Sequence, residues 1–174
     1  MDLIQLKIPW QFIRERCSLG WRQLKYGLDN ELIDSAVTVE RAIDLLGEQA
    51  DTDPGVIELA ALRPGQCGQS ILAELADAEP PLDVAEVQDT WLYLVLAWVY
   101  EHRSEFSDPL QTVEMVYADF GCPQSIEGFV RYMPSEGPNV GRLENEKRLM
   151  ERWRLFVLRQ SKRLMTARPR GDRG

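Results

Sequence analysis

Residues 91–100 read WLYLVLAWVY, from Trp91 to Tyr100, and this is the longest apolar run in the chain. The run is roughly half of the about 20 residues that a membrane-spanning helix needs. A helix that is apolar all round has to be covered on most sides by other elements. The run therefore predicts a buried helix at the centre of the fold.

Proline and acidic residues mark where this helix and its neighbours begin. Glu79-Pro80-Pro81 is the clearest break in the chain, and Asp83 or Asp89 can cap a long helix that runs to about Glu105. Asp53-Pro54 and Asp108-Pro109 each combine an N-cap residue with a first-turn proline. These pairs predict the start of two more helices.

Further helices follow from apolar spacing and from glycine and proline breaks. Leu32, Ala36, Val39, Ile43 and Leu46 recur at steps of four and three, which places them on one face of a helix over residues 31–46. Gly27 and Gly47 are expected to end their helices. Other helices are predicted at residues 10–16, 21–26, 53–61, 70–78 and 124–132, and a long last helix carries an amphipathic stripe of Leu143, Leu149, Met150, Trp153, Phe156, Val157 and Leu164.

Together these elements predict a mainly all-α protein of a single domain. We expect residues 1–168 to form a helical bundle around the buried central helix, with a minor strand pair near Leu3 to Ile8 as an option. Residues 169–174 have too little apolar surface to fold and are expected to be a disordered tail.

Charge is divided unevenly along the chain, which has a net charge of −8. From Asp44 to Glu101 there are twelve acids and one base, Arg63, whereas from Arg142 to Gly174 eleven bases accompany four acids. One explanation is internal attraction between the basic last helix and the acidic middle. The other is an exposed acidic face that meets a basic partner.

No familiar catalytic or cofactor motif is present. His102 is the single histidine, and Cys17, Cys67 and Cys122 are too far apart for a metal knuckle or a disulfide framework. Neither a phosphate-binding loop nor a dinucleotide fingerprint occurs. We therefore predict no cofactor, no metal, no transmembrane segment and a cytoplasmic protein.

Two stretches near the end of the chain stand out. They are Tyr117-Ala118-Asp119-Phe120-Gly121 and Phe129-Val130-Arg131-Tyr132-Met133-Pro134, and they bracket one helix-turn-helix segment. Asp119 and Arg131 can pair across that turn. Such a pair either pins the turn or forms part of a binding surface, and the structural role is favoured.

The same stretches resemble a bacterial family known only as a domain of unknown function, number 2247. The resemblance is carried by Tyr117, Asp119, Phe120, Phe129, Arg131, Tyr132 and Pro134, with a clear match over about residues 108–134. It implies a bacterial, cytoplasmic protein and implies no activity.

The function predicted first is a protein-protein interaction module, such as an immunity protein that neutralises a toxin by occlusion. This prediction is an analogy from size, acidity and helical content. The partner would be a basic, toxin-like protein, and the oligomeric state is left open. The candidate partner-binding residues are Asp77, Glu79, Asp83, Glu86 and Asp89.

Two alternatives remain open. One is a carboxylate-based, metal-assisted hydrolase that uses scattered acids of the middle segment. The other is a nucleic-acid or membrane-surface adaptor that uses the basic C-terminal helix, although the sequence has no base-reading motif and does not favour nucleic acid.

Overall fold

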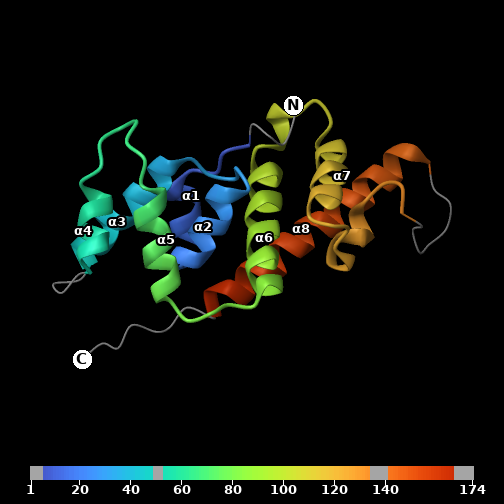
Figure 1. Ribbon diagram of the computed structural model, residues 1–174. Coiled ribbons are helices and arrows are strands. Elements are labelled where there is room, and N and C mark those ends of the chain that lie inside the picture. Colours follow the sequence, from blue (N-terminus) through green and yellow to red (C-terminus); the bar gives the residue numbers. More distant parts are fainter. Residues whose placement is uncertain (1–5, 49–52, 134–140, 167–174) are drawn as a thin grey trace. The chain divides into compact units, whose positions relative to one another are not determined.

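The computed structural model describes residues 6–48, 53–133 and 141–166, and within them it contains helices and no strand. The all-α prediction is confirmed. The option of a strand pair is not realised at Leu6–Ile8, and residues 3–5 lie outside the described residues. The helices are α1 (Trp10–Arg16), α2 (Trp21–Asp29), α3 (Ser35–Glu48), α4 (Pro54–Ala60), α5 (Gln69–Ala78), α6 (Val84–Glu101), α7 (Pro109–Asp119) and α8 (Arg142–Thr166), with short 3-10 helices η2 (Arg103–Glu105) and η3 (Gln124–Phe129) (Figure 1).

The chain divides into two compact units, which are residues 2–87 and residues 88–174 with Met1. In the N-terminal unit α2 and α4 pack on α5, while α1 and α4 pack on α3 (Figure 1). In the C-terminal unit α8 packs on η3. A single domain over residues 1–168 stays a prediction, because compact units also occur within one domain. The expected tail, residues 169–174, lies outside the described residues.

The central apolar run forms α6, as predicted. Asp83 begins the helix, since its Oδ1 accepts a hydrogen bond from the backbone N–H of Ala85 at 3.0 Å. Every residue from Trp91 to Ala97 is buried, and so is Val99. The helix ends at Glu101 rather than near Glu105, because η2 replaces its expected last turn.

Both Asp-Pro pairs start helices, as predicted. Asp53 Oδ1 accepts from the backbone N–H of Gly55 at 2.7 Å, and Asp108 Oδ1 accepts from that of Gln111 at 3.1 Å. These carboxylates satisfy backbone donors that the first turn of a helix leaves without a partner.

The burial of α3 departs from what its apolar spacing suggests. An amphipathic helix ordinarily turns its apolar face to the core. Here Val37, Thr38 and Ala42 are buried, whereas Ile43 is 52% exposed and Leu46 38% exposed. The expected start at residue 31 is also wrong, because Glu31 has a left-handed backbone with φ of 58° and α3 begins at Ser35.

The two glycines expected to end helices lie inside them instead. Gly27 is followed by two more residues of α2, and Gly47 by Glu48 at the end of α3. A single glycine costs a helix about 1 kcal/mol, which packing offsets.

Aromatic side chains hold α8 in the C-terminal unit. Trp153 of α8 stacks on Phe129 with ring centroids 6.5 Å apart and meets Tyr100 of α6 edge-on at 5.2 Å. Leu149 and Phe156, which belong to the same predicted amphipathic stripe as Trp153, are also buried, but Leu143 is 76% exposed. The predicted stripe is therefore confirmed at its middle and wrong at its first residue.

Candidate functional site

The acidic candidate residues lie on α5, on the segment that follows it and on the first turns of α6. Asp77 is in the last turn of α5, Asp83 caps α6, and Glu86 and Asp89 lie on successive turns of α6. All four side chains are exposed, and Glu79 is half-buried. The structure thus puts four of the five predicted acids where a partner can reach them.

Two exposed apolar side chains lie among these acids, and sequence reasoning missed them. Leu82 is 43% exposed and Val84 is 64% exposed. They follow the Pro80-Pro81 break directly and flank Asp83. The sequence could have indicated their exposure, because Leu82 and Val84 lie in a short connection and belong to no helical pattern of apolar residues. We call Asp77, Leu82, Asp83, Val84 and Glu86 the acidic turn.

Glu79 has a different role from the acids around it, because its carboxylate caps the start of helix α2. Its two oxygens accept hydrogen bonds from the backbone N–H groups of Trp21 at 2.8 Å and Arg22 at 2.9 Å, at the start of α2. In return the Arg22 side chain donates to the carbonyl oxygens of Glu79 at 3.0 Å and Asp77 at 3.4 Å. A carboxylate at a helix N-terminus and a guanidinium at a helix C-terminus both oppose the helix dipoles. This clasp fixes the end of α5 and so the base of the acidic turn.

Gly20 makes the clasp possible. It is the N-cap residue of α2 and has no side-chain oxygen of its own. A Cβ at this position would lie 2.8 Å from both carboxylate oxygens of Glu79, closer than such contacts are found in proteins. The absent side chain therefore leaves room for the carboxylate that replaces the usual Ser or Asp cap.

The Arg131 side chain of the second motif stretch is held by two acids of α7 and its cap. Arg131 Nε donates to Glu114 Oε1 at 2.7 Å, Nη2 to Glu114 Oε2 at 3.3 Å, and Nη1 to Asp108 Oδ2 at 2.8 Å. The predicted pair with Asp119 is wrong, because Asp119 is exposed at the end of α7 and the guanidinium bonds to Asp108, which caps the start of that helix, and to Glu114 at its middle. Hydrogen bonds with Glu114 raise the pKa of Arg131 above its usual range.

The other motif residues support the same segment. Tyr117 is buried and its hydroxyl donates to Glu127 Oε1 at 3.3 Å, and desolvation together with the Glu127 charge raises the pKa of Tyr117 to about 12. Tyr132 is exposed and meets the Tyr117 ring edge-on, with centroids 5.9 Å apart. Phe129 is buried against Trp153, Phe120 is half-buried just after α7, and Pro134 lies outside the described residues. These contacts fasten the motif to α7 and α8.

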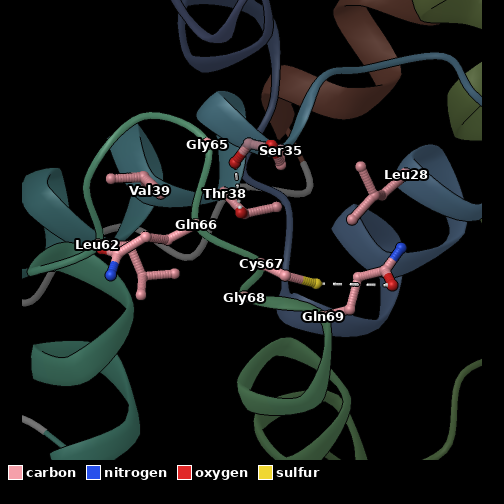
Figure 2. Close-up of a pocket in the computed structure, with 10 residues that line it drawn as sticks. All are labelled: Leu28, Ser35, Thr38, Val39, Leu62, Gly65, Gln66, Cys67, Gly68 and Gln69. Atoms are coloured by element: carbon pink, nitrogen blue, oxygen red, sulfur yellow. Dashed lines mark hydrogen bonds between the residues drawn. The ribbon is translucent and has the colours of Figure 1, made fainter.

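A hollow of about 290 Å³ lies in the N-terminal unit, between α2, α3 and the loop that precedes α5 (Figure 2). Val39 and Leu62 line it from one side and Leu28 from the other (Figure 2). Gly68 brings the loop backbone close, because a Cβ there would lie 2.6 Å from a Leu62 methyl carbon. The hollow is slightly smaller than most small-molecule sites, which begin at about 300 Å³.

The polar groups around this hollow are engaged locally. The Thr38 hydroxyl donates to the Ser35 carbonyl oxygen at 2.7 Å, and the exposed Cys67 thiol lies 3.8 Å from Gln69 Oε1 (Figure 2). Elsewhere in the described part of the chain, no three His, Cys, Asp or Glu side chains are close enough together to hold a metal ion. None of the helices described is both long enough and apolar enough to cross a membrane.

Comparison with known proteins places the chain in a family but gives it no activity. No curated protein and no solved structure matches it. The family model described as an uncharacterized protein conserved in bacteria matches residues 10–161, which is most of the chain. This match contains the described part of both motif stretches and all of the acidic turn. The chain therefore belongs to the bacterial family of uncharacterized proteins designated DUF2247.

Proposed function

We propose that this chain is a protein-protein interaction module of the bacterial cytoplasm that uses the acidic turn to cover a basic surface of its partner. An immunity protein that neutralises a toxin by occlusion works in this way. The observation that carries the proposal is the exposure of Leu82 and Val84 between Asp77, Asp83 and Glu86.

This combination suits protein recognition. Burial of apolar surface favours association, and the surrounding charges select the partner and speed encounter. Leu82 and Val84 would be the apolar anchors. The acids around them favour a partner with Lys and Arg, and they disfavour nucleic acid, whose phosphates they repel. The clasp at Glu79 holds the turn in place before binding, which lowers the entropy cost of association.

The test is affinity capture from the lysate of the source bacterium, at low and at moderate salt, followed by mass spectrometry. We expect a stoichiometric basic protein that is released by salt. Leu82→Ser with Val84→Ser should lose it at all salt concentrations. Asp77→Lys with Glu86→Lys should slow its association mainly at low salt, since screening weakens surface charge pairs. Glu79 is left unchanged, because its substitution would disturb α2 and α5 together.

A matched charge control is Glu105→Lys with Asp119→Lys, which changes the net charge equally at exposed positions of η2 and α7. It should keep the partner. Equal loss with both double variants would mean that overall charge, and not the acidic turn, is recognised. Capture of an acidic protein, or full binding by the Leu82 and Val84 variant, would contradict the proposal.

A second candidate function is favoured by the exposed side of α8. Leu155 is 42% exposed and Leu158 45% exposed, and Arg159, Lys162 and Arg163 lie beside them on the same helix. Exposed leucines next to basic residues are typical of helices that lie on anionic membranes. Binding to nucleic acid would need only the basic residues, so the exposed leucines do not favour it. This helix therefore favours a membrane-surface adaptor as the competing function.

Vesicle flotation separates the two candidates. An adaptor should float with vesicles that contain anionic lipid and should lose this binding when Leu155 and Leu158 are both replaced by Ser. The same variant should leave capture of a basic protein partner unchanged. No flotation with anionic vesicles would reject the adaptor, and binding to single-stranded RNA without flotation would assign α8 to nucleic acid instead.

A further inference from the structure

The exposed face of α3 carries apolar residues at the spacing used between packed helices. Ala36, Val39, Ile43 and Leu46 follow one another at steps of three, four and three. This alternation is the heptad spacing of helices that pack side by side. The fold of the N-terminal unit does not use it, because α3 buries Val37, Thr38 and Ala42 instead. We call these four residues the α3 stripe.

The α3 stripe begins beside the hollow described above. Val39 belongs both to the stripe and to the wall of the hollow, opposite Leu28 and next to Leu62 (Figure 2). A hollow of about 290 Å³ has room for one large side chain. Pockets of this kind at the edge of an apolar stripe take the anchor residue of a docking helix.

Charge around the α3 stripe selects the kind of helix that fits. Glu40 and Glu58 are exposed on α3 and on the neighbouring α4. Glu48 is exposed at the end of α3 on the side away from the stripe, because it lies five residues after Ile43 and nine after Val39. The half-buried Arg41 lies 3.9 Å from Glu48 and extends over the Trp10 ring, so its charge is partly balanced. The exposed flank of the stripe, at Glu40 and Glu58, is therefore acidic.

We propose that the α3 stripe is a docking surface for an amphipathic helix of another protein, with basic flanks and one large apolar side chain that enters the hollow. A second copy of this chain is a poorer occupant, because two α3 helices would bring the same acidic flanks together. The proposal concerns other residues than the acidic turn and does not depend on the proposed function. Either surface can fail its test alone.

The probe for the test is a synthetic helix of three heptads, about 21 residues, with Leu at the stripe positions and Lys on both flanks. A second peptide carries Glu in place of Lys. Fluorescence anisotropy should show that the Lys peptide binds and that the Glu peptide binds at least about tenfold more weakly. Binding of the Lys peptide should weaken as salt is added.

Variants then locate the contact. Ile43→Asp should weaken binding of the Lys peptide by about tenfold or more, because Ile43 is the most exposed large residue of the stripe. Leu143→Asp is the matched control, since it puts the same charge at an exposed leucine at the start of α8, outside the stripe and the acidic turn. It should leave peptide binding unchanged. The circular dichroism spectra of both variants should match that of the unchanged protein, as both positions are at the surface.

Three results would overturn the proposal. Equal binding by the unchanged protein and Ile43→Asp would mean that the peptide binds elsewhere. Equal binding of the Lys and Glu peptides would remove the charge argument. Sedimentation that shows a dimer of the unchanged protein and a monomer of Ile43→Asp would assign the stripe to a second copy of the chain.

Discussion

Helices α6 and α3 both carry strong apolar patterns but are buried in different ways. From Trp91 to Ala97, α6 is buried on every side, whereas α3 buries one face and leaves Ile43 and Leu46 at the surface. A helix that is apolar all round has one possible environment, but an amphipathic helix in a small protein can present its apolar side to the core or to a partner. The comparison shows that an apolar pattern alone does not fix burial. The N-terminal unit leaves apolar side chains of α3 at the surface, where a partner can contact them, whereas the buried side chains of α6 stabilise the fold.

The largest expected effect tests the α6 side of this comparison. Trp91→Ala removes a fully buried indole and should lower the free energy of unfolding by about 3–5 kcal/mol in urea denaturation. Val84→Ala on the same helix should change it by less than about 0.5 kcal/mol, because Val84 is exposed. Similar losses for both variants would contradict the central role of the buried run.

A single domain over residues 1–168, as we propose, should unfold in one transition, and two transitions would contradict it.

The next effect tests which face of α3 is packed. Ala42 is fully buried, so Ala42→Leu should cost about 1–3 kcal/mol through overpacking. Ile43→Ala, at the next position, should cost less than about 0.5 kcal/mol. Thermal denaturation of the pair gives the answer directly. A large loss for Ile43→Ala with none for Ala42→Leu would reverse the assignment of the two faces.

A smaller effect is expected at the clasp between α5 and α2. Glu79→Ala removes both acceptors of the α2 N–H groups and should cost about 1–2 kcal/mol, whereas Glu74→Ala on the exposed side of α5 should cost almost nothing. Gly20→Ser in the Glu79→Ala background should recover part of the loss, because a serine can cap α2 once the carboxylate is gone. In the unchanged background the same serine should destabilise, since its Cβ meets Glu79. Stabilisation by Gly20→Ser in both backgrounds would contradict the clasp.

The smallest effect is a pH dependence at one aspartate in each unit. Hydrogen bonding from the Trp10 indole, 2.6 Å away, lowers the pKa of Asp44 on α3 despite its partial burial. Burial alone would raise the pKa of Asp108, but hydrogen bonds from Arg131 and the Gln111 backbone outweigh it and lower that pKa. A depressed folded pKa means stability that is present above the ordinary value of 3.8 and is lost as pH falls below it.

The measurement is the urea concentration at the midpoint of unfolding, taken at pH values from about 5 to about 2.5. Carboxyl groups titrate in this range. Stability should fall with acid in the unchanged protein and fall less steeply in Asp44→Asn and Asp108→Asn. The effect should be small because both carboxylates are partly exposed and screened. An identical acid slope in all three proteins would show that neither aspartate is responsible.

Much of the helical framework could be predicted from local residues. Asp53-Pro54 and Asp108-Pro109 act within four residues of the chain, and the helices begin where these pairs predict. The burial of Trp91 to Ala97 followed from composition alone, because no side of that helix is polar. Such features need no knowledge of distant neighbours.

The features that sequence reasoning missed depend on residues far apart in the chain. Glu79 bonds to α2 across 57 and 58 positions, so its distinction from the exposed acids around it cannot be seen in the local sequence. Arg131 pairs with Asp108 and Glu114 rather than the nearer Asp119, because the segment after η3 returns to the start of α7. The buried face of α3 is likewise set by α1 and α4, which pack on it.

The clasp between Glu79 and α2 also has a consequence for biosynthesis. A chain leaves the ribosome from its N-terminus, so residues 21–29 emerge well before residue 79 has been added. Until then the backbone N–H groups of Trp21 and Arg22 lack the carboxylate that caps them, and Gly20 offers no substitute. The second helix of the protein therefore acquires its complete start only after the fifth has been synthesised, and the newly made chain gains this contact late.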